Sequence, residues 1–342
     1  MKKNHRRIIS LTAAAVLMAG MLAGCGGSVI TTGDSGSSGS TASVSSSGGD
    51  SSSGDKLKVA WIGVSASDES TIAIGKFAED YAEEIGTVEI VSYDAQADPQ
   101  TQVNCVNNAI TQQCDAIMVA PLDATAISPS LKDAMNAGII VLTCTIDVAD
   151  ESCRNAYVGV DDTEAGRIAA EQIVKKFPDG GKAVMVEGNA GESVQINRTE
   201  GFEEVLADSK VELIDKHTTE AWEAETAMTV AQDFLTKYDD IDAIYCQWDN
   251  GTVAVVQAIE ATGKSVDDFF IVSVDGCYNG FDLVRDGDIY STVMLDYNAT
   301  MQKAIDLIVD AKNNGKSIDE SYYYIDPILI TSENVDDYDP GW

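Results

Sequence analysis

Short apolar segments alternate with amphipathic segments along most of the chain from Lys56 onward. The apolar segments have the length and β-branched content of buried strands, and between them apolar residues recur at helical spacing. The expected strands span residues 57–64, 88–93, 116–120, 139–144, 183–187, 211–214, 242–246, 270–275 and 291–295, with another from Tyr157 and a Tyr-rich one before Pro327. Such alternation is typical of parallel sheets covered by helices on both faces, so the expected fold class is α/β.

The stretch from Tyr157 to Lys176, YVGVDDTEAGRIAAEQIVKK, lies midway through this series. It predicts a strand, an acidic turn and an amphipathic helix, and Asp161 with Glu164 three residues later has the form of an N-terminal capping box. The strand–helix units before and after the stretch follow the same plan. We therefore expect two similar Rossmann-like lobes, with the chain passing from one to the other at this turn.

The first 55 residues do not follow the strand–helix pattern. Residues 1–25 combine a basic start with an apolar run too short for a comfortable membrane span, which is the layout of a secretory signal. Residues 26–55 are almost all Gly, Ser and Thr with scattered Asp, a composition that favours a flexible linker. The folded body is therefore expected to begin near Lys56.

Composition and motifs argue against several function classes. A formal net charge of −34 disfavours nucleic acid as a partner. Outside the expected signal His217 is the only histidine, too few for a His-rich catalytic zinc site. A GxGxxG loop after a strand, a Walker A loop and a GxSxG elbow are all missing from the sequence. Carboxylate pairs at glycosidase separation can arise by chance in so acidic a chain, and we predict no enzyme activity, metal or cofactor.

The cysteines show no CxxC pair. Cys105 and Cys114 fall on one expected helix about 13 Å apart, which is too far for a disulfide. Two other pairs lie close enough in the expected fold to leave a disulfide open, namely Cys144 with Cys153 and Cys246 with Cys277. The favoured interpretation for all of these is small buried hydrophobes.

In open parallel α/β sheets, ligands bind beyond the carboxyl ends of the strands. Polar side chains follow most of the expected strands, and two loop tryptophans stand beside carboxylates, where each offers an apolar face and one N–H donor. That combination suits a polar ligand with CH and OH faces, such as a sugar. The candidate binding residues from this pattern are Asp68, Glu69, Thr145, Asp147, Trp222, Trp248, Asp249 and Asp275.

The chain from about Lys56 to Thr331 resembles the type I periplasmic binding proteins, specifically the ribose-binding-like receptors of ABC sugar transporters. The matching segments include residues 157–176, GNAGESVQINRTEGFEEVL, AIYCQWDNGTVAVVQAI and IVSVDGCYNGFDLVRDGDI. The resemblance implies two lobes joined by a three-crossover hinge, a ligand enclosed between them and delivery to a permease. The expected N-terminal lobe is 56–161 plus 295–324, and the C-terminal lobe is 162–294 plus 325–334.

Within that resemblance, Asp275 takes the place of the aspartate that hydrogen-bonds sugar hydroxyls, and Trp222 that of a stacking aromatic. The chain also departs from the pattern, because Trp248 replaces an asparagine and Thr145 stands where an aspartate is expected. Asn197 joins the candidates as a neighbour of the position of a ligand arginine. These departures disfavour ribose itself and leave open another sugar, an amino sugar, or a cationic or nucleoside-like metabolite.

Leu22-Ala23-Gly24-Cys25 resembles the lipobox of bacterial lipoproteins. This resemblance implies lipidation of Cys25 and an extracytoplasmic protein that is anchored to the cell membrane. The expected partners are a small-molecule ligand, an ABC permease and the membrane through the anchor, and the expected state is a monomer. A sensory receptor that presents its ligand to a membrane kinase remains an alternative, whereas a transcription regulator is disfavoured because a signal occupies the place of a DNA-binding headpiece.

Overall fold

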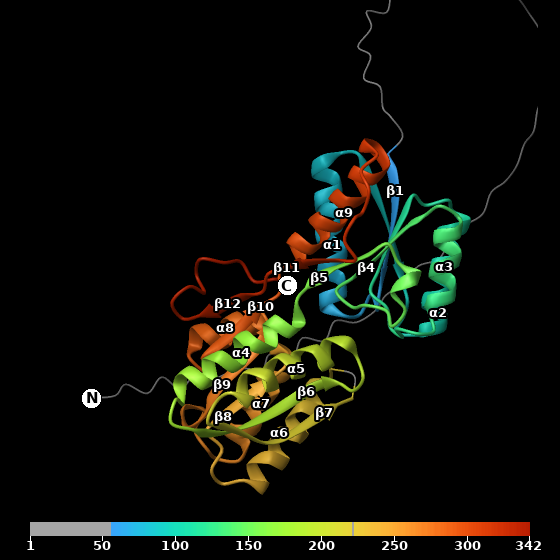
Figure 1. Cartoon of the computed structure of the whole chain (residues 1–342). Helices are drawn as coiled ribbons and strands as arrows, with labels where there is room; N and C mark the ends of the chain where they lie inside the picture. Colours follow the sequence, from blue (N-terminus) through green and yellow to red (C-terminus); the bar gives the residue numbers. More distant parts are fainter. Residues whose placement is uncertain (1–55, 221) are drawn as a thin grey trace, which may run out of the picture. The chain divides into compact units, whose positions relative to one another are not determined.

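The computed structural model describes residues 56–220 and 222–342, and Figure 1 shows their helices and strands. The signal predicted for residues 1–25, the linker predicted for 26–55 and the lipidation of Cys25 lie outside the described residues. The described part of the chain forms two six-stranded sheets with helices packed on them.

The first sheet has the strand order β11-β5-β4-β3-β1-β2, and all of its neighbouring strands are parallel. Its strands are β1 (Leu57–Gly63), β2 (Val88–Asp94), β3 (Ala116–Val119), β4 (Ile140–Cys144), β5 (Ala156–Val160) and β11 (Tyr322–Ile325). Its helices are α1 (Glu69–Ile85), α2 (Pro99–Thr111), α3 (Ser128–Asn136) and α9 (Tyr297–Asn314), with a short 3-10 turn η1 (Glu151–Cys153). We call these elements the first lobe.

Side-chain alternation along β1 explains why helices cover both faces of the first sheet. Val59 and Trp61 point into a core with α1 and α9, whereas Ala60 and Ile62 point into a second core with α2 and α3. Figure 1 shows α1 and α9 side by side on one face and α2 and α3 on the other. A strand buried on both faces is apolar at every position, which is why the sequence shows near-continuous apolar runs.

The second sheet has the order β12-β10-β9-β8-β6-β7, in which only β12 is antiparallel to its neighbour, β10, among the described strands. Its strands are β6 (Gly181–Asn189), β7 (Val211–Thr219), β8 (Ala243–Cys246), β9 (Phe270–Asp275), β10 (Ser291–Met294) and β12 (Ile328–Thr331). Its helices are α4 (Asp162–Lys176), α5 (Ser193–Ala207), α6 (Ala224–Lys237), α7 (Asp249–Ala261) and α8 (Tyr278–Asp286), with a 3-10 turn η2 (Val266–Asp268). These elements form the second lobe, whose cores pack α4 and α5 on one face and α6, α7 and α8 on the other.

The chain passes between the two sheets three times, after β5, after β10 and after β11. At the first passage Asp161 caps α4 by accepting a hydrogen bond from the Glu164 backbone N–H at 3.1 Å. The predicted α/β fold with two similar lobes and three crossovers is confirmed. The residue ranges predicted for the two lobes stay a prediction.

Two further observations concern the described residues. The cysteines among them are all free and buried, which confirms the interpretation as small hydrophobes. They are Cys105, Cys114, Cys144, Cys153, Cys246 and Cys277. Neither of the two disulfides that the sequence left open is formed. None of the helices in residues 56–220 and 222–342 has the length and apolar character needed to span a bilayer.

Candidate functional site

A cavity of about 690 Å³ is lined by residues of both lobes. Its volume lies within the range of small-molecule sites. The first lobe contributes the loops that follow β1, β3 and β4, and the second lobe contributes those that follow β6, β7, β8 and β9. The cavity therefore collects the carboxyl ends of strands from two sheets, which is where parallel α/β sheets bind ligands.

The structure brings six of the predicted binding residues to this cavity. They are Asp68, Glu69, Thr145, Trp222, Trp248 and Asp275. The other three, Asp147, Asn197 and Asp249, are not part of its lining. The carboxylates of Asp147 and Asp249 accept hydrogen bonds from other protein groups and do not face the cavity.

Asp147 belongs to an ion pair inside the first lobe. Both of its oxygens accept from Arg154, Oδ1 from Nε and Oδ2 from Nη2, each at 2.7 Å. Oδ1 also accepts from the Thr143 hydroxyl at 2.7 Å and from the Val148 N–H at 2.8 Å. Arg154 in turn donates from Nη1 to the carbonyl of Ser321, just before β11. Asp147 therefore holds the first lobe together, and we remove it from the proposed ligand contacts.

Asp249 is completely buried at the start of α7. Its Oδ2 accepts from the backbone N–H groups of Gly276 and Cys277 at 2.8 and 3.0 Å, and its Oδ1 accepts from the Thr292 hydroxyl at 2.8 Å. Burial raises the pKa of this carboxyl. The side chain fixes the loop after β9, so it supports the cavity wall from behind. Gly280 is required there, because a Cβ at this position would lie 1.9 Å from Asp249 Oδ2.

Asp275 ends β9 and lines the cavity with a side chain that is 15% exposed. Its backbone has a φ of 128°, an unusual conformation for a residue with a side chain. Within residues 56–220 and 222–342, its carboxylate receives two long contacts, from Arg198 Nη1 to Oδ1 and from the Asp249 N–H to Oδ2, both at 3.4 Å. Burial raises the pKa of Asp275, because the loss of hydration outweighs the attraction of Arg198.

Arg198 belongs to the part of the cavity lining that the second lobe provides. Its Nε donates to Asp162 Oδ1 at 2.8 Å, and its Nη1 donates to the carbonyl of Gln247. The side chain is 3% exposed and still contributes to the cavity lining. Because its strongest contacts go to Asp162 and Gln247, the guanidinium only partly compensates Asp275.

Two tryptophans form an apolar corner of the cavity. The rings of Trp222 and Trp248 meet edge to face, with centroids 5.4 Å apart and an interplanar angle of 89°. Trp222 donates from Nε1 to Glu192 Oε2 at 2.6 Å, and its ring lies so close to Gly188 that a Cβ there would be 2.0 Å away. Trp248 is buried, and its Nε1–H has no hydrogen-bond partner among the described residues. Both rings line the cavity, and the Arg198 guanidinium lies 5.7 Å from the centre of the Trp222 ring.

Several residues that line the cavity are not among the binding residues predicted from the sequence. Asn250 is the second residue of α7 and lies among the polar residues that follow β8, which is the kind of position that the sequence pattern singles out. Tyr297 is the first residue of α9, Asn279 lies on α8, and Trp342 lies beyond β12. Local pattern gives no sign that those positions meet at one cavity.

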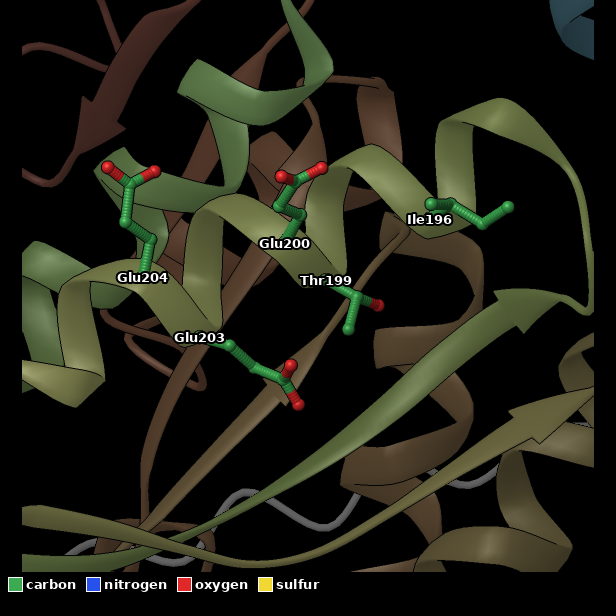
Figure 2. A pocket seen from close by; sticks show the side chains of 5 residues that line it. All are labelled: Ile196, Thr199, Glu200, Glu203 and Glu204. Atoms are coloured by element: carbon green, nitrogen blue, oxygen red, sulfur yellow. The ribbon is translucent and has the colours of Figure 1, made fainter.

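A second hollow, of about 500 Å³, lies over α5 and is lined by Ile196, Thr199, Glu200, Glu203 and Glu204 (Figure 2). Two of its carboxylates already pair with neighbouring cations, Glu203 with Lys216 at 2.6 Å and Glu204 with Arg167 at 2.8 Å. Its walls all come from one helix, and the candidate site is therefore the cavity between the lobes.

Comparison with known proteins shows that the chain is similar to periplasmic binding proteins. The family model of the periplasmic binding protein domain matches residues 59–317. The chain is 30% identical over 280 residues to the xylitol-binding protein of Mycolicibacterium smegmatis, covering 80% of this chain and 78% of that protein. It is 28% identical to the fructose import binding protein of Bifidobacterium longum, covering 93% and 92% of the two chains. The crystal structure of a periplasmic ribose ABC transporter protein from Conexibacter woesei superposes with a TM-score of 0.77 at 27% identity, covering 83% and 94%.

Proposed function

Because the chain belongs to the periplasmic binding protein family, we propose that it captures a sugar or sugar derivative in the cavity between its lobes and delivers it to an ABC importer. Its relatives include proteins named for binding xylitol and importing fructose. Capture takes place by closure of the two lobes about the three crossovers, a hinge motion that encloses the ligand. The proposal includes no catalytic step.

The observation that carries this proposal is the aromatic corner of Trp222 and Trp248 beside Asp275. A sugar ring presents C–H groups on its faces and hydroxyl groups at its edge. The indole faces match the C–H groups, and the carboxylate of Asp275, which receives only two contacts at 3.4 Å, has acceptor capacity left for hydroxyl donors. Each hydrogen bond between the Asp275 carboxyl and a ligand hydroxyl contributes about 0.5–1.5 kcal/mol, and several together orient a small ligand.

We assign the proposed ligand contacts to the residues that line the cavity. From the second lobe these are Trp222, Trp248 and Asp275, and from the first lobe Asp68, Glu69 and Thr145. Arg198 is a positioning residue, because its ion pair with Asp162 fixes it next to Asp275. The role of each residue in binding is part of the proposal.

The experiment that tests the function is identification of the bound molecule. The protein is purified without denaturation, and its extract is analysed by mass spectrometry for sugars and polyols. In parallel, the stripped protein is screened by thermal shift against pentoses, hexoses, polyols, amino sugars and nucleosides. We expect at least one sugar or polyol to raise the melting temperature in a concentration-dependent way. A protein that yields no such molecule and shifts with none of them contradicts the proposal.

A second candidate ligand class follows from the charges around the cavity. Four carboxylates line it, those of Asp68, Glu69, Glu192 and Asp275, whereas the arginine in the lining, Arg198, is already paired. A cationic ligand would gain from this field, and aromatic faces also attract cations. An amino sugar combines both features. A shift in melting temperature with amino sugars and cationic metabolites but with no neutral sugar would favour this class.

We also propose that the protein is a monomeric lipoprotein that is anchored outside the cytoplasm through Cys25. The support is the sequence of residues 22–25 after an apolar segment, together with the family. Cys25→Ser is expected to move the protein from the membrane fraction to the soluble fraction, as followed by immunoblot after fractionation. Retention of the variant in the membrane fraction would count against lipidation.

A further inference from the structure

Every tryptophan in the chain lines the same cavity. The sequence contains four, Trp61, Trp222, Trp248 and Trp342, and all four belong to its lining. Trp61 is also part of the first-lobe core, and Trp222 and Trp248 are accounted for by the aromatic corner. Trp342 lies beyond the last strand of the second sheet and has no role in the site described above.

The backbone around Trp342 is attached to the loop that carries Asp275. Gly341 donates its N–H to the carbonyl of Gly276 at 2.8 Å, and the carbonyl of Trp342 accepts from the N–H of Tyr278 at 2.6 Å. Gly276 has a φ of 74°, and a Cβ added to it would lie 2.4 Å from the Met294 side chain. The loop after β9 is therefore closely packed and has little freedom to move. Trp342 is therefore held next to the proposed ligand carboxylate.

The ring of Trp342 contacts the other lobe. It stacks on Tyr297, with centroids 5.0 Å apart and planes 16° from parallel. Tyr297 is the first residue of α9, directly after the second crossover, and it also lines the cavity. The backbone of Trp342 thus belongs to the second lobe, while its indole lies on the first residue of a first-lobe helix.

The indole is not needed to anchor its own segment. Val335 already buries this part of the chain in the second-lobe core, where it is 4% exposed, and Arg285 bonds the Val335 carbonyl and the Asp336 carboxylate. Trp342 itself is absent from the apolar clusters of the described residues and is partly exposed. A large aromatic ring that lines a cavity without joining a core has its remaining surface directed to whatever occupies that cavity.

We propose that Trp342 is a further ligand-contacting residue, which packs on the ligand beside Asp275 and limits its size to a single sugar unit. This inference rests on the proposed function, since it takes the ligand to be a sugar or polyol. The support for a size limit is the position of the ring, which links the loop after β9 to the first residue of α9 at the cavity wall.

The test compares the wild type with Trp342→Leu and with Tyr338→Leu. Tyr338 lies in the same segment and is 38% exposed, but it is outside the cavity lining. Calorimetric titration with the monosaccharide or polyol that binds best, and with a disaccharide containing it, gives affinities for all three proteins. We expect Trp342→Leu to weaken monosaccharide binding at least ten-fold and to bring the affinities for the monosaccharide and the disaccharide closer together. Tyr338→Leu should have the same two affinities as the wild type. A folded Trp342→Leu protein with wild-type affinities and preference overturns the proposal.

A second measurement does not depend on Trp342→Leu folding. Incorporation of 5-fluorotryptophan gives one fluorine NMR signal for each tryptophan, and Trp342→Phe, which keeps an aromatic ring, assigns the signal of Trp342. The ligand is expected to shift that signal along with those of Trp222 and Trp248. A signal that stays in place while those two shift overturns the proposal. If no sugar or polyol binds the wild type, the proposed function fails, and the same titrations with the co-purified molecule still decide whether Trp342 contacts the ligand.

Discussion

Each lobe places an aspartate near the carboxyl end of a sheet strand and beside a buried arginine, but the two carboxylates are used differently. Asp147, three residues after β4, receives four hydrogen bonds of 2.7–2.8 Å from Arg154, Thr143 and Val148. Asp275, at the end of β9, receives two contacts of 3.4 Å and lines the cavity. A carboxylate with all its acceptor capacity satisfied by protein stabilises the fold, whereas one with capacity left can bind a ligand.

The two arginines account for the difference. Arg154 directs both Nε and Nη2 at Asp147, which is the bidentate geometry of a strong ion pair. Arg198 directs Nε at Asp162 and only a long Nη1 contact at Asp275. Asp162 lies at the first passage between the lobes, so the second-lobe arginine is tied to the crossover and not to the ligand carboxylate. The same pair of residue types thus gives a structural bridge in one lobe and a proposed ligand-binding group in the other.

The largest expected effect is on the structural member of the comparison. Asp147→Ala should lower the free energy of unfolding by about 3–5 kcal/mol, because it leaves the 1% exposed Arg154 side chain without its charge partner. Urea denaturation followed by circular dichroism measures this loss. The control is Glu204→Ala, which breaks a surface pair with Arg167 and should cost less than about 1 kcal/mol. Equal losses for the two variants would mean that Asp147 is no more structural than a surface carboxylate.

The second prediction concerns the binding member. Asp275→Asn should weaken ligand binding ten-fold or more, about 1.4 kcal/mol or above, while the protein stays folded. Asparagine keeps the shape of the side chain, so the change mainly replaces one carboxyl oxygen by an amide nitrogen. Isothermal titration of the ligand identified by mass spectrometry gives the affinity, and urea denaturation gives the stability. Unfolding of the variant, in place of a loss of affinity alone, would make Asp275 a structural residue like Asp147.

How well the sequence predicts a feature of the structure depends on how far apart in the chain the contacting residues lie. The strand–helix alternation, the two similar halves and the cap of Asp161 on Glu164 are local features, and the structure confirms them. The antiparallel strand β12 was not predicted, because its short apolar run gains strand character only from pairing with β10, more than thirty residues earlier in the chain.

The site was predictable only in part, for the same reason. A polar residue after a strand is a local signal, and it singled out Asp147, Asp249 and Asp275 alike. Whether such a residue faces the cavity depends on partners from elsewhere in the chain, such as Thr292 for Asp249 and Arg198 for Asp275. Trp342 shows the limit most clearly, because nothing in its neighbouring sequence indicates a contact with Tyr297.

The pH dependence of stability offers a third way to separate Asp275 from Asp147. Burial raises the pKa of Asp275 in the folded protein above its unfolded value of about 4. The folded state therefore binds this proton more strongly, so the group's contribution to stability is complete below about pH 4 and is lost as the pH rises through the raised pKa. The unfolding free energy of wild type minus that of Asp275→Asn should fall over this range, by at most about 1.4 kcal/mol per pH unit. A difference that rises with pH would show that Arg198 outweighs burial and lowers the pKa.

The smallest expected effect tests whether a first-lobe carboxylate in the cavity lining is already used by the protein. Asp68 caps α1, with Oδ1 accepting from the Thr71 N–H at 2.7 Å and from the Ser70 hydroxyl at 2.6 Å. Asp68→Ala should therefore cost about 1 kcal/mol of stability, and Asp68→Asn, which also caps helices well, only a few tenths. Asp68 Oδ1 already accepts hydrogen bonds from the protein, as the Asp147 carboxylate does. The two Asp68 variants should therefore lose less ligand affinity than Asp275→Asn in the same titrations. A ten-fold loss of affinity with Asp68→Asn at unchanged stability would instead show that Asp68 contributes as much to ligand binding as Asp275 does.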